Sequence, residues 1–135
     1  MYGGGYTAGA SSDPVYNVSY LVKEAGSMGT PIIVVSMNYR VASFGFIASE
    51  EVMNEGATNL GLKDQRLALE WVKANMHAFG GDCERITIWG ESAGAYSVGL
   101  QILAYGGRKS GLFHRAILES GTPLATYRES VLKST

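Results

Sequence analysis

The stretch Ile86-Thr87-Ile88-Trp89-Gly90-Glu91-Ser92-Ala93-Gly94-Ala95-Tyr96 decides the fold of this chain. An apolar, partly β-branched run leads into a Gly-x-Ser-x-Gly pentapeptide, and the residues that follow favour a helix. The pattern predicts a strand, a sharp turn at Ser92 and a helix, which together expose the serine hydroxyl above a parallel sheet. We expect Gly90 and Gly94 to prevent side-chain collisions in this turn, and Ser92 to have a strained backbone.

Length and composition set the class of protein. The 135 residues have room for one hydrophobic core and not for two domains, and 46% of them are hydrophobic. The net charge is −1 without a basic block, so a nucleic acid or an acidic membrane surface has no electrostatic support as a partner. No apolar run is long enough to span a bilayer. Cys83 is the one cysteine, which excludes an internal disulfide.

Segments with strand and helix character alternate on both sides of the predicted turn at Ser92, which we call the nucleophile elbow. Residues 32–38 are almost continuously β-branched, which predicts a strand buried on both faces. A second strand is expected over 116–120, and helices over 15–28, 62–79 and 93–103. Residues 39–46 read as an irregular aromatic connection and 49–61 as a loop with about one turn of helix. Strands alternating with helices, without a hairpin signal, predict a parallel sheet and the α/β class.

The helix over 62–79 is the clearest one after the elbow. Its apolar residues recur at helical spacing and are expected to face the core, while three polar residues can face water. The apolar set is Leu67, Trp71, Val72, Met76 and Phe79, and the polar set is Gln65, Glu70 and Lys73.

Ser92 is the candidate nucleophile. A Gly-x-Ser-x-Gly match also arises by chance in glycine-rich chains, but here a predicted strand precedes it and a helix follows. Acyl transfer creates an oxyanion that needs hydrogen-bond donors. The amide of Ala93 lies at the start of the helix, and the loop Gly3-Gly4-Gly5 can bring further amides close because it has no side chains. Without the elbow, that loop would read as a flexible turn.

None of the residues considered so far is a good candidate for the general base that would activate Ser92. The chain has two histidines, His77 and His114, and both read better as surface or structural residues. In folds with a nucleophile elbow the chain order is serine, then acid, then histidine. We therefore expect the acid and the histidine beyond Thr135, which makes this chain an incomplete active site.

Several strings together resemble the type-B carboxylesterase/lipase family, in its order and spacing up to Pro123. They are the glycine triplet with its flanking tyrosines at 2–6, then 38–41 with 44–46, 59–72, 79–82 leading into 86–94, and 116–121. The family includes cholinesterases, carboxylesterases, fungal lipases and non-catalytic adhesion proteins. Ala95 and the ending 119–123 look most similar to the fungal lipase branch. Cys83 departs from the family, which often has proline there.

The resemblance implies a partial α/β-hydrolase fold, a mostly parallel sheet with flanking helices, truncated at both ends. It also implies that residues 1–135 are an internal fragment of a single such domain. Ser92 would be the nucleophile, and the amides of Gly4, Gly5 and Ala93 would form the oxyanion hole.

Supporting roles follow from the same resemblance. Glu91 would lie near the catalytic histidine and tune it, although on sequence alone it could be a solvated turn residue. Ser120 would lie near the acid and histidine, or simply satisfy a strand end. Arg40 and Asp64 read as members of a buried structural ion pair.

The sequence therefore predicts a serine ester hydrolase that needs no cofactor or metal and acts on a small-molecule or lipid ester. The alternatives are a non-catalytic adhesion homologue, which usually lacks the elbow serine, and a catalytically inactive fragment. Secretion of the whole protein is an inference from the family. Asn17 begins a glycosylation triplet, which matters only if the protein is secreted.

Overall fold

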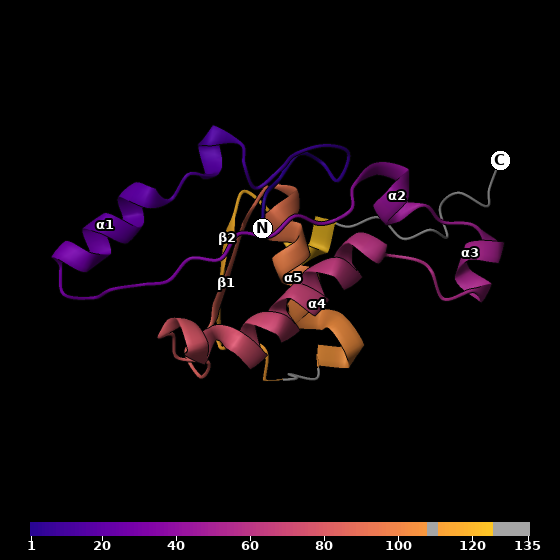
Figure 1. Cartoon of the computed structure of the whole chain (residues 1–135). Helices are drawn as coiled ribbons and strands as arrows, with labels where there is room; N and C mark the ends of the chain where they lie inside the picture. Colours follow the sequence, from indigo (N-terminus) through magenta and orange to yellow (C-terminus); the bar gives the residue numbers. More distant parts are fainter. Residues whose placement is uncertain (108–110, 126–135) are drawn as a thin grey trace.

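The predicted strand–turn–helix around Ser92 lies at the centre of the structure (Figure 1). The structure, a computed structural model, describes residues 1–107 and 111–125. Strand β1, Thr87–Glu91, leads to Ser92, and helix α5, Ala93–Gly107, begins directly after it. Strand β2, Arg115–Glu119, lies parallel to β1. The α/β class and both strands around the elbow are confirmed.

The core forms where α5 and α4, Leu60–Asn75, meet the sheet. It joins Leu69 of α4, Ile88 of β1, Val98 of α5 and Leu112, and each of the four is less than 9% exposed. Helix α5 packs against both strands, and α4 lies against α5. The sheet and α5 therefore hold the turn at Ser92 in place from both sides.

The buried face of the helix predicted over 62–79 agrees with the prediction at Val72 and Met76, which are 8% and 7% exposed, and differs elsewhere. Leu67, Trp71 and Phe79 are at least half exposed, and Gln65, which was expected to face water, is fully buried. The face that packs inward carries Gly61, Gln65, Leu69 and Val72. The apolar spacing fits two stripes on this helix, and only tertiary packing decides which of them is covered.

Residues 32–38 do not form the predicted buried strand. No described residue pairs with this stretch in a ladder, and Ile32, Ile33, Val34 and Val35 are between 37% and 48% exposed. Met37 nevertheless packs against the core cluster. A β-branched run expresses a preference for extended backbone, but a strand exists only where a neighbouring strand accepts its hydrogen bonds.

The remaining elements are short. The helix predicted over 15–28 is split into a 3₁₀ turn, η1 (Pro14–Tyr16), and α1 (Ser19–Ser27), with exposed Asn17 between them. The aromatic connection contains helix α2 (Ala42–Phe46), which the sequence did not predict. The expected single turn in 49–61 is α3 (Glu50–Asn54). Two further 3₁₀ turns are η2 (Met76–Phe79), which continues α4, and η3 (Pro123–Ala125).

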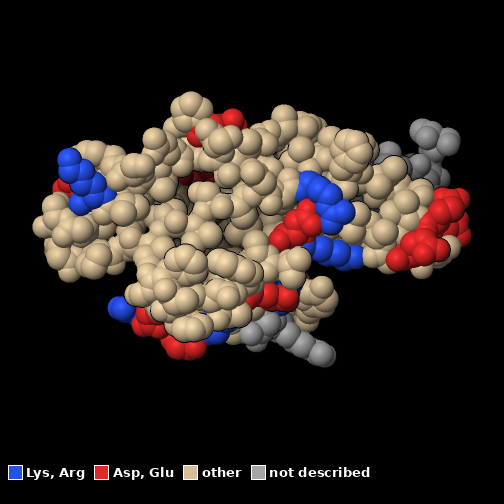
Figure 2. All heavy atoms as spheres, in the orientation of Figure 1, with Lys and Arg blue, Asp and Glu red and all other residues tan. Residues whose placement is uncertain are grey.

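Helix α5 ends earlier than its outer bounds suggest, because the backbone from Ala104 to Gly106 is not helical. On the face seen in Figure 2, acidic and basic side chains are interspersed on a largely uncharged surface. Among the described residues, no helix is both long and apolar enough to cross a membrane.

We expect Gly90→Ala to destabilise the folded protein by about 3 kcal/mol. A Cβ at this position would lie 2.2 Å from the carbonyl oxygen of Gly94, a backbone atom that cannot move aside without breaking the turn. The matched control is Gly26→Ala in α1, where nothing lies within 4 Å. That change should stabilise by about 0.5–1 kcal/mol. Urea unfolding followed by circular dichroism measures both, and equal stability of the two variants would contradict the expectation.

Candidate active site

Ser92 has the strained backbone that its sequence predicts. Its φ is 53°, in the left-handed region that non-glycine residues rarely adopt. Its N–H donates to the Glu119 carbonyl oxygen at 2.8 Å, and its own carbonyl accepts from the Tyr96 N–H at 3.0 Å. Ser92 is thus tied to β2 on one side and to α5 on the other, which keeps it in this conformation.

Glycines permit the close approaches around the turn. A Cβ on Gly90 would lie 2.2 Å from the Gly94 carbonyl oxygen, and one on Gly94 would lie 2.2 Å from the Met1 carbonyl oxygen. A Cβ on Gly121, just after β2, would lie 2.7 Å from the Ser92 carbonyl oxygen. The sequence predicted the need for the first two glycines, while Gly121 gave no local signal.

The glycine loop at the start of the chain lies against the elbow, as predicted. A Cβ on Gly3 would lie 3.0 Å from Cβ of Ser92 and 2.7 Å from Oε2 of Glu91. Gly4 and Gly5 follow with φ values of 104° and 63°. Sequence reasoning chose Gly4 and Gly5 and gave Gly3 no separate role, but Gly3 is the residue whose missing side chain allows the approach to Ser92.

Three amides of this region have no partner among the described residues. The N–H groups of Gly4, Gly5 and Ala93 donate no hydrogen bond within the described part of the chain, whereas Gly3 N–H donates to the Tyr16 hydroxyl at 2.8 Å. Ala93 is 1% exposed and begins α5, where the helix dipole favours negative charge. The free donors are those predicted to face an oxyanion.

The two predicted supporting residues lie on either side of Ser92. Glu91 directly precedes it, and its Oε2 accepts a hydrogen bond from the Tyr16 hydroxyl at 3.3 Å. Ser120 follows Glu119, the register partner of Glu91, and has a φ of 55°. Tyr16 is the residue that the sequence analysis missed, because no local pattern links it to residues 75 positions away.

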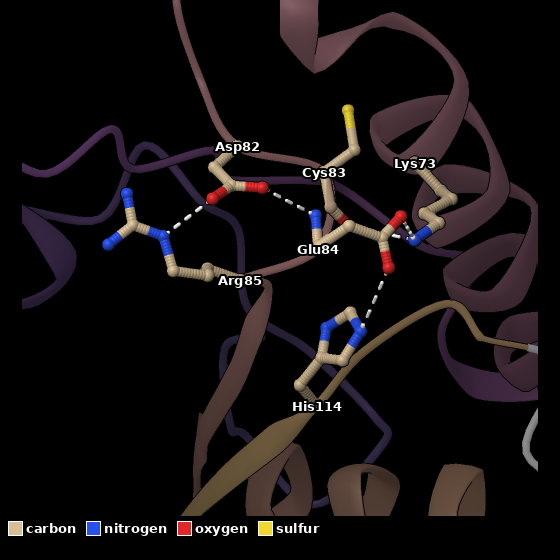
Figure 3. Close-up of polar contacts among 6 residues, drawn as sticks. All are labelled: Lys73, Asp82, Cys83, Glu84, Arg85 and His114. Atoms are coloured by element: carbon tan, nitrogen blue, oxygen red, sulfur yellow. Dashed lines mark hydrogen bonds and ion pairs between the residues drawn. The ribbon is translucent and has the colours of Figure 1, made fainter.

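Neither histidine lies near Ser92. Nε2 of His114 is 3.6 Å from Oε2 of Glu84, at the opposite end of the strands (Figure 3). Five strand residues separate that end from the elbow, which is roughly 17 Å. His77 is exposed in η2. Within the described residues, the nucleophile candidate and the donors come together without a histidine.

The histidine belongs to a surface cluster of charged groups. Nζ of Lys73 lies 2.6 Å from Oε1 of Glu84, and Nε of Arg85 lies 2.6 Å from Oδ2 of Asp82. Figure 3 shows both ion pairs as dashed lines. The Lys73 ammonium lowers the pKa of the Glu84 carboxyl. The cluster joins the end of α4 to the turn before β1, so its role is structural.

The Arg40–Asp64 ion pair forms as predicted but is not buried. Nε and Nη2 of Arg40 contact the two carboxylate oxygens of Asp64 at 2.8 and 2.6 Å, and the Arg40 N–H donates to Oδ2 at 3.0 Å. The side chains are 49% and 25% exposed. The pair connects the segment before α2 to α4, and the Arg40 guanidinium lowers the pKa of the Asp64 carboxyl.

A network of hydrogen-bonded polar side chains lies buried between α4 and α5. Gln65 Nε2 donates to Ser97 Oγ at 3.0 Å, and Ser97 Oγ donates to the Tyr6 hydroxyl at 3.2 Å. Gln101 Nε2 donates to the Leu62 carbonyl oxygen at 2.8 Å. Burial raises the pKa of the Tyr6 hydroxyl, although the hydrogen bond with Ser97 acts in the opposite direction. The network connects the far end of the glycine loop to both helices.

A strained serine between a parallel strand and a helix, beside a glycine loop, defines a nucleophile elbow of the α/β-hydrolase type. The profile of the carboxylesterase family matches residues 1–131, and the chain belongs to this family.

The similar proteins include lipases and an acetylcholinesterase, as the predicted resemblance to the type-B carboxylesterase/lipase family implies. A secreted lipase of Arthroderma benhamiae is 48% identical over 89% of this chain and 21% of its own length. Lipase 2 of Geotrichum candidum is 47% identical over 96% of this chain and 23% of its own length. Acetylcholinesterase of Danio rerio is 50% identical over 91% of this chain and 18% of its own length. The chain thus spans about a fifth of these relatives.

A solved structure has the same fold. A thermophilic PNB esterase superposes with a TM-score of 0.79 at 40% identity, over 90% of this chain and 24% of the esterase chain.

We expect Asp64→Asn to lower the free energy of unfolding by about 1 kcal/mol at pH 7, because the pair is screened by solvent. The pKa of the Asp64 carboxyl is lowered in the folded state, so its contribution is present above the ordinary pKa and disappears as the pH falls through the lowered value. Urea unfolding at pH 7 and at about pH 3 measures the difference between the two proteins. A difference that grows toward low pH would contradict the assignment.

Proposed function

We propose that the protein carrying this chain is a serine carboxylic ester hydrolase that needs no cofactor, with Ser92 as its nucleophile. The observation that carries the proposal is Ser92 with a φ of 53° between β1 and α5, with Gly3 packed against its Cβ. Six described non-glycine residues have a positive φ, and Ser92 is the one among them that lies between β1 and α5 beside a loop with free amides, an arrangement common in catalytic turns. Membership of the carboxylesterase family supports the same reaction class.

In the proposed reaction, Ser92 Oγ attacks the ester carbonyl carbon and its proton passes to a general base. The tetrahedral intermediate then collapses, and the base returns this proton to the departing alkoxide, which leaves as the alcohol. Water loses a proton to the same base and attacks the acyl carbon, and Ser92 Oγ regains the proton as the carboxylic acid leaves. The amides of Gly4, Gly5 and Ala93 would donate to the oxyanion. Each such donor contributes about 2.7–4 kcal/mol to lowering the barrier in comparable sites.

The base and its acid partner are proposed to lie beyond Thr135. His114 lies at the opposite end of the strands from Ser92, and this chain matches only 21% of the length of the Arthroderma benhamiae relative. Glu91 precedes the proposed nucleophile, and its carboxylate would orient the catalytic histidine of the whole protein or adjust the pKa of that histidine. Ser120 would support the same region from the end of β2.

Ester substrates follow from the relatives' names, which include lipases and an acetylcholinesterase. We propose a small-molecule or lipid ester as substrate. Several relatives are named as secreted lipases, which supports secretion of the whole protein. Exposed Asn17 would then be accessible for glycosylation.

Two alternatives are weaker. A non-catalytic adhesion homologue has no need of a strained serine, so Ser92 and the free amides beside it favour the enzyme. The second alternative, a catalytically inactive fragment, applies only to the isolated 135 residues. We propose that these residues alone do not hydrolyse esters, because they bring no histidine close to Ser92.

A fluorophosphonate probe should label the natural protein at Ser92, since it reacts with serines that have an activated hydroxyl. Mass spectrometry of the labelled peptide identifies the site. Ser92→Ala should abolish the label, while Ser43→Ala, at an exposed serine in α2, should retain it. A folded natural protein that takes up no label would contradict the proposed function.

The isolated 135-residue chain should hydrolyse p-nitrophenyl butyrate no faster than its Ser92→Ala variant. The physical reason is that a serine hydroxyl is a poor nucleophile until a base removes its proton. Hydrolysis is followed by absorbance of the released p-nitrophenol. Turnover that depends on Ser92 would show that a base exists within these residues and would overturn the location proposed for it.

A further inference from the structure

We propose that Tyr16 is a positioning residue that fixes the direction of the glycine-loop amides, an inference that rests on the serine esterase function proposed above. Its hydroxyl accepts a hydrogen bond from Gly3 N–H at 2.8 Å and donates one to Oε2 of Glu91 at 3.3 Å. One oxygen atom thereby bridges the loop and the residue next to the nucleophile.

The Gly3 end of the glycine loop needs such a bond because no side chain of the loop can hold it, whereas the Gly4 carbonyl accepts from the Thr7 and Ala8 N–H groups at 3.1 and 3.2 Å. Gly3, Gly4 and Gly5 have no Cβ, and Gly4 and Gly5 have φ values of 104° and 63°. Glycine backbone rotates readily, so an unanchored loop would sample several peptide orientations. An oxyanion donor is effective only when it is already aimed at the developing charge.

Anchors hold the chain on both sides of the loop. The rings of Tyr2 and Tyr39 stack with centroids 4.3 Å apart, and the Tyr39 hydroxyl donates to the Tyr2 carbonyl at 2.7 Å. On the other side, the Tyr6 carbonyl accepts from Ala42 N–H at 2.6 Å. Between these anchors, Tyr16 provides a side-chain hydrogen bond to a loop amide.

The hydrogen bond between Gly3 and Tyr16 also determines which N–H groups of the loop remain available to an oxyanion. Because Gly3 N–H donates to Tyr16, it is not available to an oxyanion, while the amides of Gly4 and Gly5 have no partner among the described residues. The shorter of the two Tyr16 bonds is the one to Gly3, at 2.8 Å against 3.3 Å for Glu91, which favours a direct action of Tyr16 on the loop.

Tyr16→Phe in the natural protein removes the hydroxyl and leaves the ring. We expect kcat for a p-nitrophenyl ester to fall about 10- to 100-fold with KM changed by less than about twofold, because donor alignment matters in the transition state. The matched control is Tyr20→Phe in α1, which is 77% exposed and has no hydroxyl hydrogen bond within the described residues. Its kcat should not change. Thermal unfolding of both variants shows that they are folded.

Measuring the effect of Tyr16→Phe in a Glu91→Ala variant distinguishes a direct action of Tyr16 on the glycine loop from an action through Glu91. If Tyr16 acts on the loop, Tyr16→Phe should slow fluorophosphonate labelling of Ser92 by a similar factor with or without Glu91. An effect that disappears in the Glu91→Ala background would overturn the proposal, as would an unchanged labelling rate in Tyr16→Phe alone. A wild-type protein that does not label at all would instead contradict the proposed esterase function.

Amide hydrogen exchange of the wild-type protein tests the same idea without a variant. Gly3 N–H should be protected in the free protein, while Gly4 and Gly5 exchange rapidly and become protected after phosphonylation of Ser92. Rapid exchange at Gly3, or protection of Gly4 and Gly5 before labelling, would contradict the proposed role of Tyr16.

Discussion

One backbone hydrogen bond, from Ser92 N–H to the Glu119 carbonyl, connects the elbow to the sheet. It continues the parallel ladder one step beyond the Glu91–Glu119 pair, although Ser92 has already left the strand conformation. Around this bond, Gly90 lets the first turn of α5 approach β1, Gly121 lets the end of β2 approach the Ser92 carbonyl, and Gly94 lets the Met1 carbonyl approach α5. The position of α5, and with it the direction of the Ala93 amide, follows from this constraint.

Features with a local signal could be predicted from the sequence. The elbow, both strands and α4 are such features, because strand propensity, glycine spacing and helical periodicity act over a few residues. Burial of Gln65 and exposure of Trp71 could not be predicted, since they depend on which stripe of α4 meets α5. Residues 32–38 show the same limit, because their local preference for a strand does not provide a pairing partner.

The candidate site shows a similar division. Its candidate nucleophile and glycine loop could be predicted from residue types and their spacing, and the structure brings them close together through Gly3 and Ser92. Tyr16 could not be recognised, because its two bonds join residues that lie 13 and 75 positions away. The burial expected for the Arg40–Asp64 pair was wrong for a related reason, since complementary charges indicate a pair but not the depth at which it lies.

The buried Gln65–Ser97 pair has a consequence for how this sequence can evolve. Both side chains are fully buried, and the Gln65 amide donates to the Ser97 hydroxyl between α4 and α5. Replacing one alone leaves a buried polar atom without its partner, which costs about 1–3 kcal/mol. Replacing both by apolar residues of matching shape removes this cost, because Gln101 Nε2 keeps its bond to the Leu62 carbonyl and the Tyr6 hydroxyl is only partly buried. The two positions are therefore coupled, and across diverging descendants of this gene they should change together or not at all.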